Sequence, residues 1–101
     1  MVLFEWDESK ASINLRKHSV RFEDAMLVFS DPFALVEQDR MAGDELRWQT
    51  LGLAGTAVLV LVAHTVQTEA EDETIRIISA RKATRKEQER YDENRAKEVS
   101  L

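Results

Sequence analysis

The sequence contains no cysteine, one proline and three glycines among its 101 residues. The lack of cysteine excludes both a disulfide framework and a thiolate zinc site. Two histidines without H-x-x-x-H spacing are too few for a histidine metal motif, so we expect no catalytic metal and no cofactor. The glycines do not form a phosphate-binding loop, and no serine has the glycine context of a nucleophile elbow. Metal-dependent, nucleotide-dependent and serine-based catalysis are therefore disfavoured.

Long apolar segments are also missing. The longest, AVLVLVA at residues 57–63, is far shorter than the roughly 18 to 20 residues that a membrane-spanning helix needs. The N-terminal stretch MVLFEWDESK has two acidic residues among its first seven and lacks the basic-then-apolar order of a secretory signal. We therefore expect no membrane association and take the cytoplasm as the default location. The length favours a single domain over residues 1–101.

Charge is distributed unevenly along the chain. The formal net charge is −5, from 14 basic and 19 acidic residues. Residues 10–21 hold four basic side chains, one histidine and no acid, and residues 76–90 hold six basic side chains and two acids. These two windows predict a basic patch on an acidic body if the fold brings them together. The alternative is a pair of solvated helix faces.

Hydrophobic periodicity predicts two helices in the first third of the chain. The segment WDESKASINLRKHS fits a helix capped by Asp7, with cations in its last turn. In RFEDAMLVFSDP, apolar residues recur at helical spacing until Pro32 ends the pattern. A helical hairpin that turns at residues 18–20 is therefore expected.

Four later segments have the alternation or the β-branched content of strands, and these are FALVEQ, LRWQTLGL, TAVLVLVAHTV and TIRIISAR. We expect DRMAGDE and QTEAEDE to be polar loops between them. A capping box of Thr84 and Glu87 begins a last helix, from about Arg85 to Lys97. The predicted fold class is α+β, with two N-terminal helices, a four-stranded antiparallel meander sheet and a C-terminal helix.

RNA cleavage is a reaction that these residues can support without a metal or a protein nucleophile, because the ribose 2′-OH can attack the adjacent phosphate. The protein must then move a proton and stabilise the phosphorane charge. His64 ends the most apolar strand and Arg76 lies in the strand predicted to pair with it, so we expect them to face one catalytic site. Strict alternation puts Arg76 and Arg81 on opposite faces, so Arg81 joins this site only if the strand bulges or ends between them.

Each candidate also has a structural interpretation. His64 can be a hydrogen-bonded residue at a strand end, and Arg76 a cross-strand partner on the surface. Tyr91 is either a proton donor or the only large anchor of the last helix. Trp6 and Trp48 can stack on bases or belong to the core. The candidates for RNA binding, which can instead be solvated surface residues, are Lys10, Lys17, His18 and Lys82.

Four blocks stand out in order along the chain, and they are FEWDESKASINLRKHSVRFEDAMLVFSDP, LRWQTLG, VLVAHT and IRIISARKATRKEQERY. Together they span about residues 4–91 and resemble the BrnT family of type II toxin–antitoxin toxins. The family's F-E-W-D-x-x-K block falls on residues 4–10, its N-x-x-K-H turn on 14–18, its H-T pair on 64–65 and its R-I-I-S-A-R block on 76–81. Two positions depart from the pattern: Ser19 replaces a turn glycine, and Arg21 replaces a helix-capping Ser or Thr.

The resemblance implies a small bacterial ribonuclease toxin with a RelE-like fold. Combined with the chemistry above, it predicts metal-independent cleavage of RNA phosphodiesters that arrests growth. Members of the family are neutralised by a BrnA-type ribbon-helix-helix antitoxin, so the expected partners are RNA, a BrnA-like antitoxin and, only through the antitoxin, operator DNA. The alternative is a catalytically inactive binding module that acts only through antitoxin and DNA. The polar last helix adds a third expectation, self-association into a homodimer.

Overall fold

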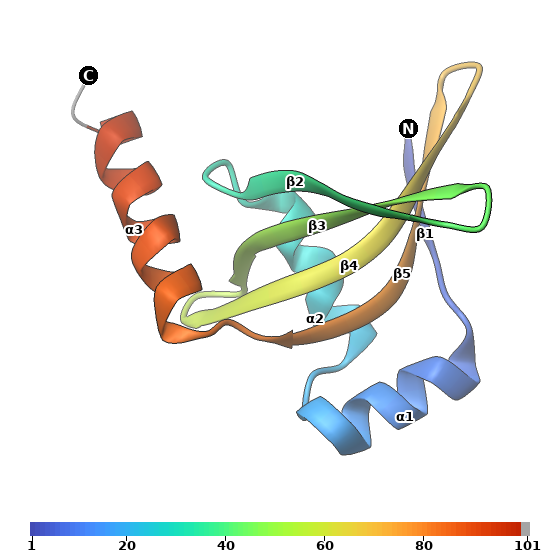
Figure 1. Cartoon of the computed structure of the whole chain (residues 1–101), viewed down its shortest axis with the longest axis horizontal. Coiled ribbons are helices and arrows are strands. Elements are labelled where there is room, and N and C mark those ends of the chain that lie inside the picture. Colours follow the sequence, from blue (N-terminus) through green and yellow to red (C-terminus); the bar gives the residue numbers. More distant parts are fainter. Residues whose placement is uncertain (100–101) are drawn as a thin grey trace.

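The computed structural model describes residues 1–99 and contains one five-stranded sheet with helices on both of its faces (Figure 1). The elements in chain order are β1 (Val2–Glu5), α1 (Glu8–His18), α2 (Phe22–Ala25), the 3₁₀ helix η1 (Met26–Ser30), β2 (Leu35–Ala42), β3 (Glu45–Ala54), β4 (Val58–Glu69), β5 (Asp72–Lys82) and α3 (Arg85–Val99). The strands lie in the order β1-β5-β4-β3-β2. The predicted α+β class is confirmed. Within residues 1–99, no helix combines the length and the apolar content needed to cross a membrane.

The strand β1 is the main departure from the predicted four-stranded meander. It pairs in parallel with β5, with Phe4 opposite Ile75 and Glu5 opposite Arg76. The sheet therefore has five strands, of which only the pairing of β1 with β5 is parallel within the described chain. Four residues are too few to show a readable alternation, so this strand leaves no periodic signal in the sequence.

The two long hairpins are another departure from prediction. The segments DRMAGDE and QTEAEDE, which we expected to be loops, lie mostly in strands, since β2 reaches Ala42 and β4 reaches Glu69. The turns themselves are short and use positive φ angles at Gly43 (65°) and Ala70 (57°). Backbone hydrogen bonds pair these arms although their tips carry mainly polar side chains, and polar composition on its own predicts loops.

The helices at the start of the chain follow the prediction in part. Asp7 caps α1 as expected, accepting hydrogen bonds from the Ser9 and Lys10 N–H groups at 2.8 and 3.1 Å. Ser19 ends α1 in the left-handed conformation with a φ of 59°, the geometry that glycine adopts most easily. The second helix is shorter than predicted, because one α-helical turn, α2, continues as η1, and Arg21 provides no side-chain cap.

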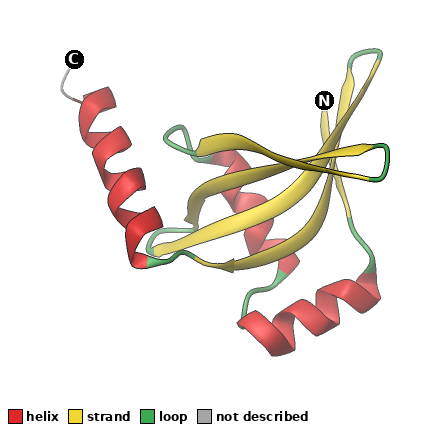
Figure 2. Cartoon of the chain, in the orientation of Figure 1, coloured by secondary structure: helices red, strands yellow, loops and turns green. Residues whose placement is uncertain are grey.

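The two faces of the sheet have different covers. One face, here termed the helix face, packs against α1, α2 and η1 through a core of Val20, Phe22, Ala25, Val28, Val60, Val62, Ile75, Ile77 and Ala80. The opposite face, termed the open face, is covered at one end by α3, whose Tyr91 packs with Leu51 and Leu61. Figure 2 shows α2 and η1 behind the strands and α3 beside one end of the sheet. Much of the open face is therefore left without a helix.

The strands β3 and β4 separate before they end. Their pairing begins at Trp48 opposite His64. Beyond these residues, β2 and β3 still pair to the end of their hairpin, and β4 and β5 do the same. The two hairpin arms therefore diverge, as Figure 1 shows, and the space between residues 44–48 and residues 65–76 is termed the fork.

The helix α3 begins at the predicted capping box. The Thr84 Oγ1 accepts a hydrogen bond from the Glu87 N–H at 3.2 Å, and a Glu87 carboxylate oxygen accepts one from the Thr84 N–H at 2.8 Å. Arg81 donates to both carboxylate oxygens of Glu87, at 2.8 and 3.0 Å. These hydrogen bonds, that from Arg81 above all, lower the pKa of Glu87 to about 2. The start of α3 is thus tied electrostatically to the end of β5.

We expect the protein to lose stability as the pH falls from about 4.5 to about 2, the ordinary and the folded-state pKa of Glu87. Because the folded-state pKa is depressed, ionised Glu87 stabilises the fold above the ordinary value, and protonation removes that contribution. It is on the order of 2 kcal/mol, less than the full shift implies because Arg81 is 38% exposed. Urea unfolding of wild type and Glu87→Gln across this pH range measures it.

The wild-type and Glu87→Gln stabilities should converge at low pH and differ most near neutral pH. Glu89→Gln is the matched control, because Glu89 pairs with Arg85 in the same helix but both side chains are largely exposed. Its pH dependence should follow that of the wild type. A Glu87→Gln profile parallel to the wild-type profile would contradict the assignment.

Candidate functional site

Arg76 lies in the fork, on the open face of β5. Its Nη2 is 2.6 Å from Glu45 Oε1 and also bonds the second carboxylate oxygen of Glu45. Since Glu45 belongs to β3, this ion pair joins the two hairpin arms across the fork. The side chains are 43% and 41% exposed, so a ligand in the fork can reach both charged groups.

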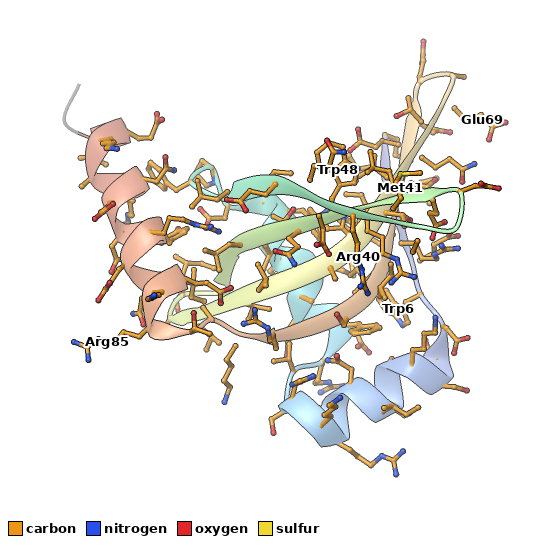
Figure 3. The ribbon with its side chains drawn as sticks, in the orientation of Figure 1. Trp6, Arg40, Met41, Trp48, Glu69 and Arg85 are labelled. Carbon is orange, nitrogen blue, oxygen red and sulfur yellow. The ribbon has the colours of Figure 1, made fainter. Side chains whose placement is uncertain are left out.

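A groove of about 640 Å³ occupies the fork. It is lined by Glu5 of β1, by Asp44, Glu45, Leu46 and Trp48 of the first arm, and by Thr65, Val66, Gln67, Thr74 and Arg76 of the second arm. Figure 3 shows Trp48 on the first arm and Glu69 at the tip of the second. The volume is within the range of small-molecule sites and admits a nucleotide.

His64 does not line this groove. It is 2% exposed and lies on the helix face opposite Ile77. Its Nε2 is 2.7 Å from Thr50 Oγ1, and the ring of Phe29 packs edge-on against it at 4.8 Å between centroids. Burial lowers the pKa of His64, which favours a neutral ring. The expectation that His64 and Arg76 face one site is wrong, and the structure instead shows a buried, hydrogen-bonded histidine.

Arg81 shares the open face with Arg76 because of a bulge. The register of β4 against β5 shifts by one residue, which leaves Ile78 without a partner. The condition stated from the sequence is therefore met: Arg81 lies opposite Leu61 and points to the same side as Arg76. Its guanidinium bonds Glu87, so Arg81 also anchors α3.

The other cationic candidates lie outside the groove. The helix α1 runs beside β5, held by Asn14, which donates to the Ala80 carbonyl at 2.9 Å and accepts from the Ala80 N–H at 3.1 Å. Lys82 pairs with Val60 in the sheet, which puts it on the helix face. None of the four RNA-binding candidates lines the groove, and they are Lys10, Lys17, His18 and Lys82; their role in RNA binding stays a prediction.

Ion pairs neutralise most of the basic window at residues 76–90. Four of its six cations have a carboxylate partner, in the pairs Arg76–Glu45, Arg81–Glu87, Arg85–Glu89 and Arg90–Glu37. The cations of the other window have no ion pair within residues 1–99, and they are Lys10, Arg16, Lys17 and Arg21. The unpaired positive charge therefore lies mainly on and beside α1.

Tyr91 is an anchor of α3. It is 2% exposed, and its hydroxyl donates to Asp31 Oδ2 at 2.6 Å. Burial, together with the neighbouring Asp31 carboxylate, raises the pKa of Tyr91 to about 12. The structure thus favours the anchor over the proton donor. Among residues 1–99 no group of three or more histidines and carboxylates is arranged to hold a metal ion.

Comparison with known proteins bears on this architecture. The family described as "Ribonuclease toxin, BrnT, of type II toxin-antitoxin system" matches residues 6–87. The crystal structure of the Brucella abortus ribonuclease toxin BrnT has the same fold, with a TM-score of 0.56 at 22% identity, over 84% of this chain and 99% of that chain. No curated protein matches the sequence. Because the family match runs from Trp6, directly after β1, to Glu87 in α3 and includes both arms of the fork, the chain belongs to the BrnT family of type II toxin–antitoxin ribonuclease toxins.

Proposed function

We propose that this ribonuclease toxin cleaves RNA in the fork, with Arg76 binding the scissile phosphate. The observation that carries the proposal is the position of the Arg76 guanidinium, which is partly exposed in a groove of nucleotide size. Arginine binds phosphate through charge-assisted hydrogen bonds, and in the free protein Arg76 Nη2 bonds both carboxylate oxygens of Glu45. The phosphate of a bound RNA displaces the Glu45 carboxylate from the Arg76 guanidinium.

Glu45 replaces His64 as the proton acceptor in this proposal. The released Glu45 carboxylate accepts the proton of the ribose 2′-OH while the 2′-oxygen attacks phosphorus. The O2′–P bond forms, the P–O5′ bond breaks, and the leaving 5′-oxygen takes a proton from water; the resulting hydroxide takes the proton from Glu45, which restores the carboxylate. Arg76 stabilises the charge that develops on the phosphorane. The products are a 2′,3′-cyclic phosphate and a free 5′-hydroxyl, and each step uses only side chains of the fork and water.

The remaining cations bind the RNA chain on either side of the fork. Arg81 lies on the same face as Arg76. Their partners on β4, Leu61 and Thr65, are four residues apart, which corresponds to about 13 Å along the strand. The α1 residues Lys10 and Lys17, with Lys82 beside Ser19 at the end of the same helix, contribute positive charge that attracts the phosphate backbone, and His18 in the last turn of α1 is a further proposed RNA contact. These groups position the substrate and take no part in the bond changes.

The type II system supplies an antitoxin partner. From the sequence resemblance we propose a BrnA-like ribbon-helix-helix protein, which neutralises the toxin and contacts operator DNA itself. The antitoxin would meet the toxin in the bacterial cytoplasm, and operator DNA would be reached only through the antitoxin. Self-association into a homodimer stays a prediction, and a sedimentation mass at high concentration tests it.

Incubation of the purified protein with end-labelled RNA in EDTA tests the reaction. We expect fragments that carry 2′,3′-cyclic phosphate and 5′-hydroxyl ends. Cleavage that requires added Mg²⁺ would overturn the metal-independent mechanism. The absence of cleavage under both conditions would favour the binding module that acts only through antitoxin and DNA.

A further inference from the structure

We infer that the fork contains a guanine-binding subsite beside the scissile phosphate, with Trp48 as its stacking surface and Glu5 as the acceptor for the base edge. The subsite rests on the proposed function, because it lies next to Arg76. It concerns which RNA sequences the toxin cleaves.

Trp48 is positioned to receive a base. It lines the groove at the point where the pairing of β3 and β4 ends, and as the cross-strand partner of His64 it borders the groove from the helix-face side, across the fork from Arg76. Trp48 is partly exposed, and within residues 1–99 its ring has no aromatic partner and its indole N–H has no acceptor. Trp6 is different, since it packs against Phe22 and donates to Glu8 at 2.9 Å. Trp6 is thus satisfied within the protein, whereas the ring of Trp48 is available for stacking on an RNA base.

Glu5 supplies an unpaired carboxylate in the same groove. It lies directly opposite Arg76 in the parallel pairing of β1 with β5, and it lines the groove. Glu45 is engaged by Arg76, but Glu5 has no hydrogen-bond or ion-pair partner within the described residues. A phosphate on Arg76 therefore brings its nucleoside within reach of a free acceptor.

The chemistry of a carboxylate selects among the four bases. An ionised carboxylate only accepts hydrogen bonds, and its two oxygens fit two adjacent donors. Guanine has such a pair on its Watson–Crick edge, in the ring N1–H and the exocyclic N2 amino group. Adenine and cytosine present one amino group beside a ring acceptor, and uracil presents one imino group between two carbonyls. Guanine is therefore the base that a carboxylate in this position binds best.

The neutral polar lining completes the site. Gln67 and Thr74, on the second arm, line the groove and can donate to the guanine O6. The volume of about 640 Å³ holds a base and its phosphate together.

Cleavage of matched RNAs that differ at a single nucleotide next to the cut tests the inference. We expect the guanosine substrate to be cleaved about 10-fold faster or more than its adenosine, cytidine and uridine counterparts. Inosine, which lacks the exocyclic amino group but keeps the N1–H, should lose most of this preference. Equal rates at all four bases would overturn the inference and leave the proposed function intact.

The Glu5→Gln variant should lose the guanosine preference while still cleaving RNA. Glu69→Gln changes the charge equally at the exposed tip of the same fork, outside the groove, and should keep the preference. Trp48→Leu should raise KM about 10-fold with a smaller change in kcat, and Trp48→Phe should restore part of the loss because a phenyl ring still stacks. An unchanged preference in Glu5→Gln would remove Glu5 from the subsite.

Binding of nucleoside 3′-monophosphates separates the two proposals. The NMR signal of the Trp48 indole N–H should shift with guanosine 3′-monophosphate at lower concentration than with the other three nucleotides. Selective binding without RNA cleavage would count against the proposed reaction and support the subsite. Cleavage without selective binding would do the opposite.

Discussion

Arg76→Ala should reduce the rate of RNA cleavage about 100- to 1,000-fold. The substitution removes the guanidinium that we assign to the developing phosphorane charge, and a single group of this kind contributes an effect of that size. It should not unfold the protein, because the Arg76–Glu45 pair is partly exposed on both sides. Single-turnover cleavage of end-labelled RNA measures the effect, and thermal unfolding of the same sample verifies the fold.

Two further variants test whether the effect of Arg76→Ala comes from losing the guanidinium at that position. Arg85→Ala removes an arginine whose side chain is 93% exposed on α3, so its cleavage rate should equal that of the wild type. Arg76→Lys keeps the charge but loses the planar fork of the guanidinium, and its rate should fall between those of the wild type and Arg76→Ala. Wild-type cleavage by Arg76→Ala would place the reaction elsewhere on the protein.

Asp31→Ala should destabilise the fold by roughly 3 to 5 kcal/mol, the largest loss of stability that we predict for a single substitution. The Asp31 carboxylate accepts hydrogen bonds from the Phe33 N–H, the Leu53 N–H and the Tyr91 hydroxyl, at 2.9, 2.9 and 2.6 Å. Burial alone would raise the pKa of Asp31, but these hydrogen bonds lower it. Alanine leaves without an acceptor the donors of β3, of α3 and of the loop before β2, in which Phe33 lies. Urea unfolding measures the loss.

A graded series shows whether Asp31 is the common acceptor. Tyr91→Phe removes one of its three donors and should cost about 1 to 2 kcal/mol. The double variant should lose less than the sum of the two single losses, because both remove the same contact. Asp39→Ala, at an exposed position of β2, should change stability by less than about 0.5 kcal/mol. A stability of Asp31→Ala equal to that of Asp39→Ala would contradict this role.

Features fixed by neighbouring residues were predictable from the sequence. The Asp7 cap and the Thr84–Glu87 capping box depend on side chains three positions apart or fewer, and both were confirmed. The short parallel strand β1 was not predictable, since its pairing partner is far away in the chain and its own pattern is too short. The polar tips of the arms predict loops, whereas the strands there are held by backbone pairing and need few apolar side chains.

The pattern of a single strand predicts some residues of the candidate site, but others depend on how the strands pair. Arg76 was found from the residue types that the reaction needs, and the condition for Arg81 to share its face was stated correctly. His64 was paired with Arg76 because cross-strand register cannot be read from one sequence, and the register puts them on opposite faces. Glu45 joins the candidate site only through the separation of the two arms, which no local pattern encodes, and the same separation puts Trp48, a base-stacking candidate from the sequence, beside the groove.

The parallel pairing of β1 with β5 also determines when, during synthesis, the groove can form. These strands lie roughly 70 residues apart along the chain. During translation, β1 leaves the ribosome first but has no partner until nearly all of β5 has followed, and contacts of such long range form slowly. The groove takes walls from β1, β3 and β5, so a partly synthesised chain has no complete groove. A cell that makes this protein therefore has an interval in which the nascent chain exists without an assembled fork.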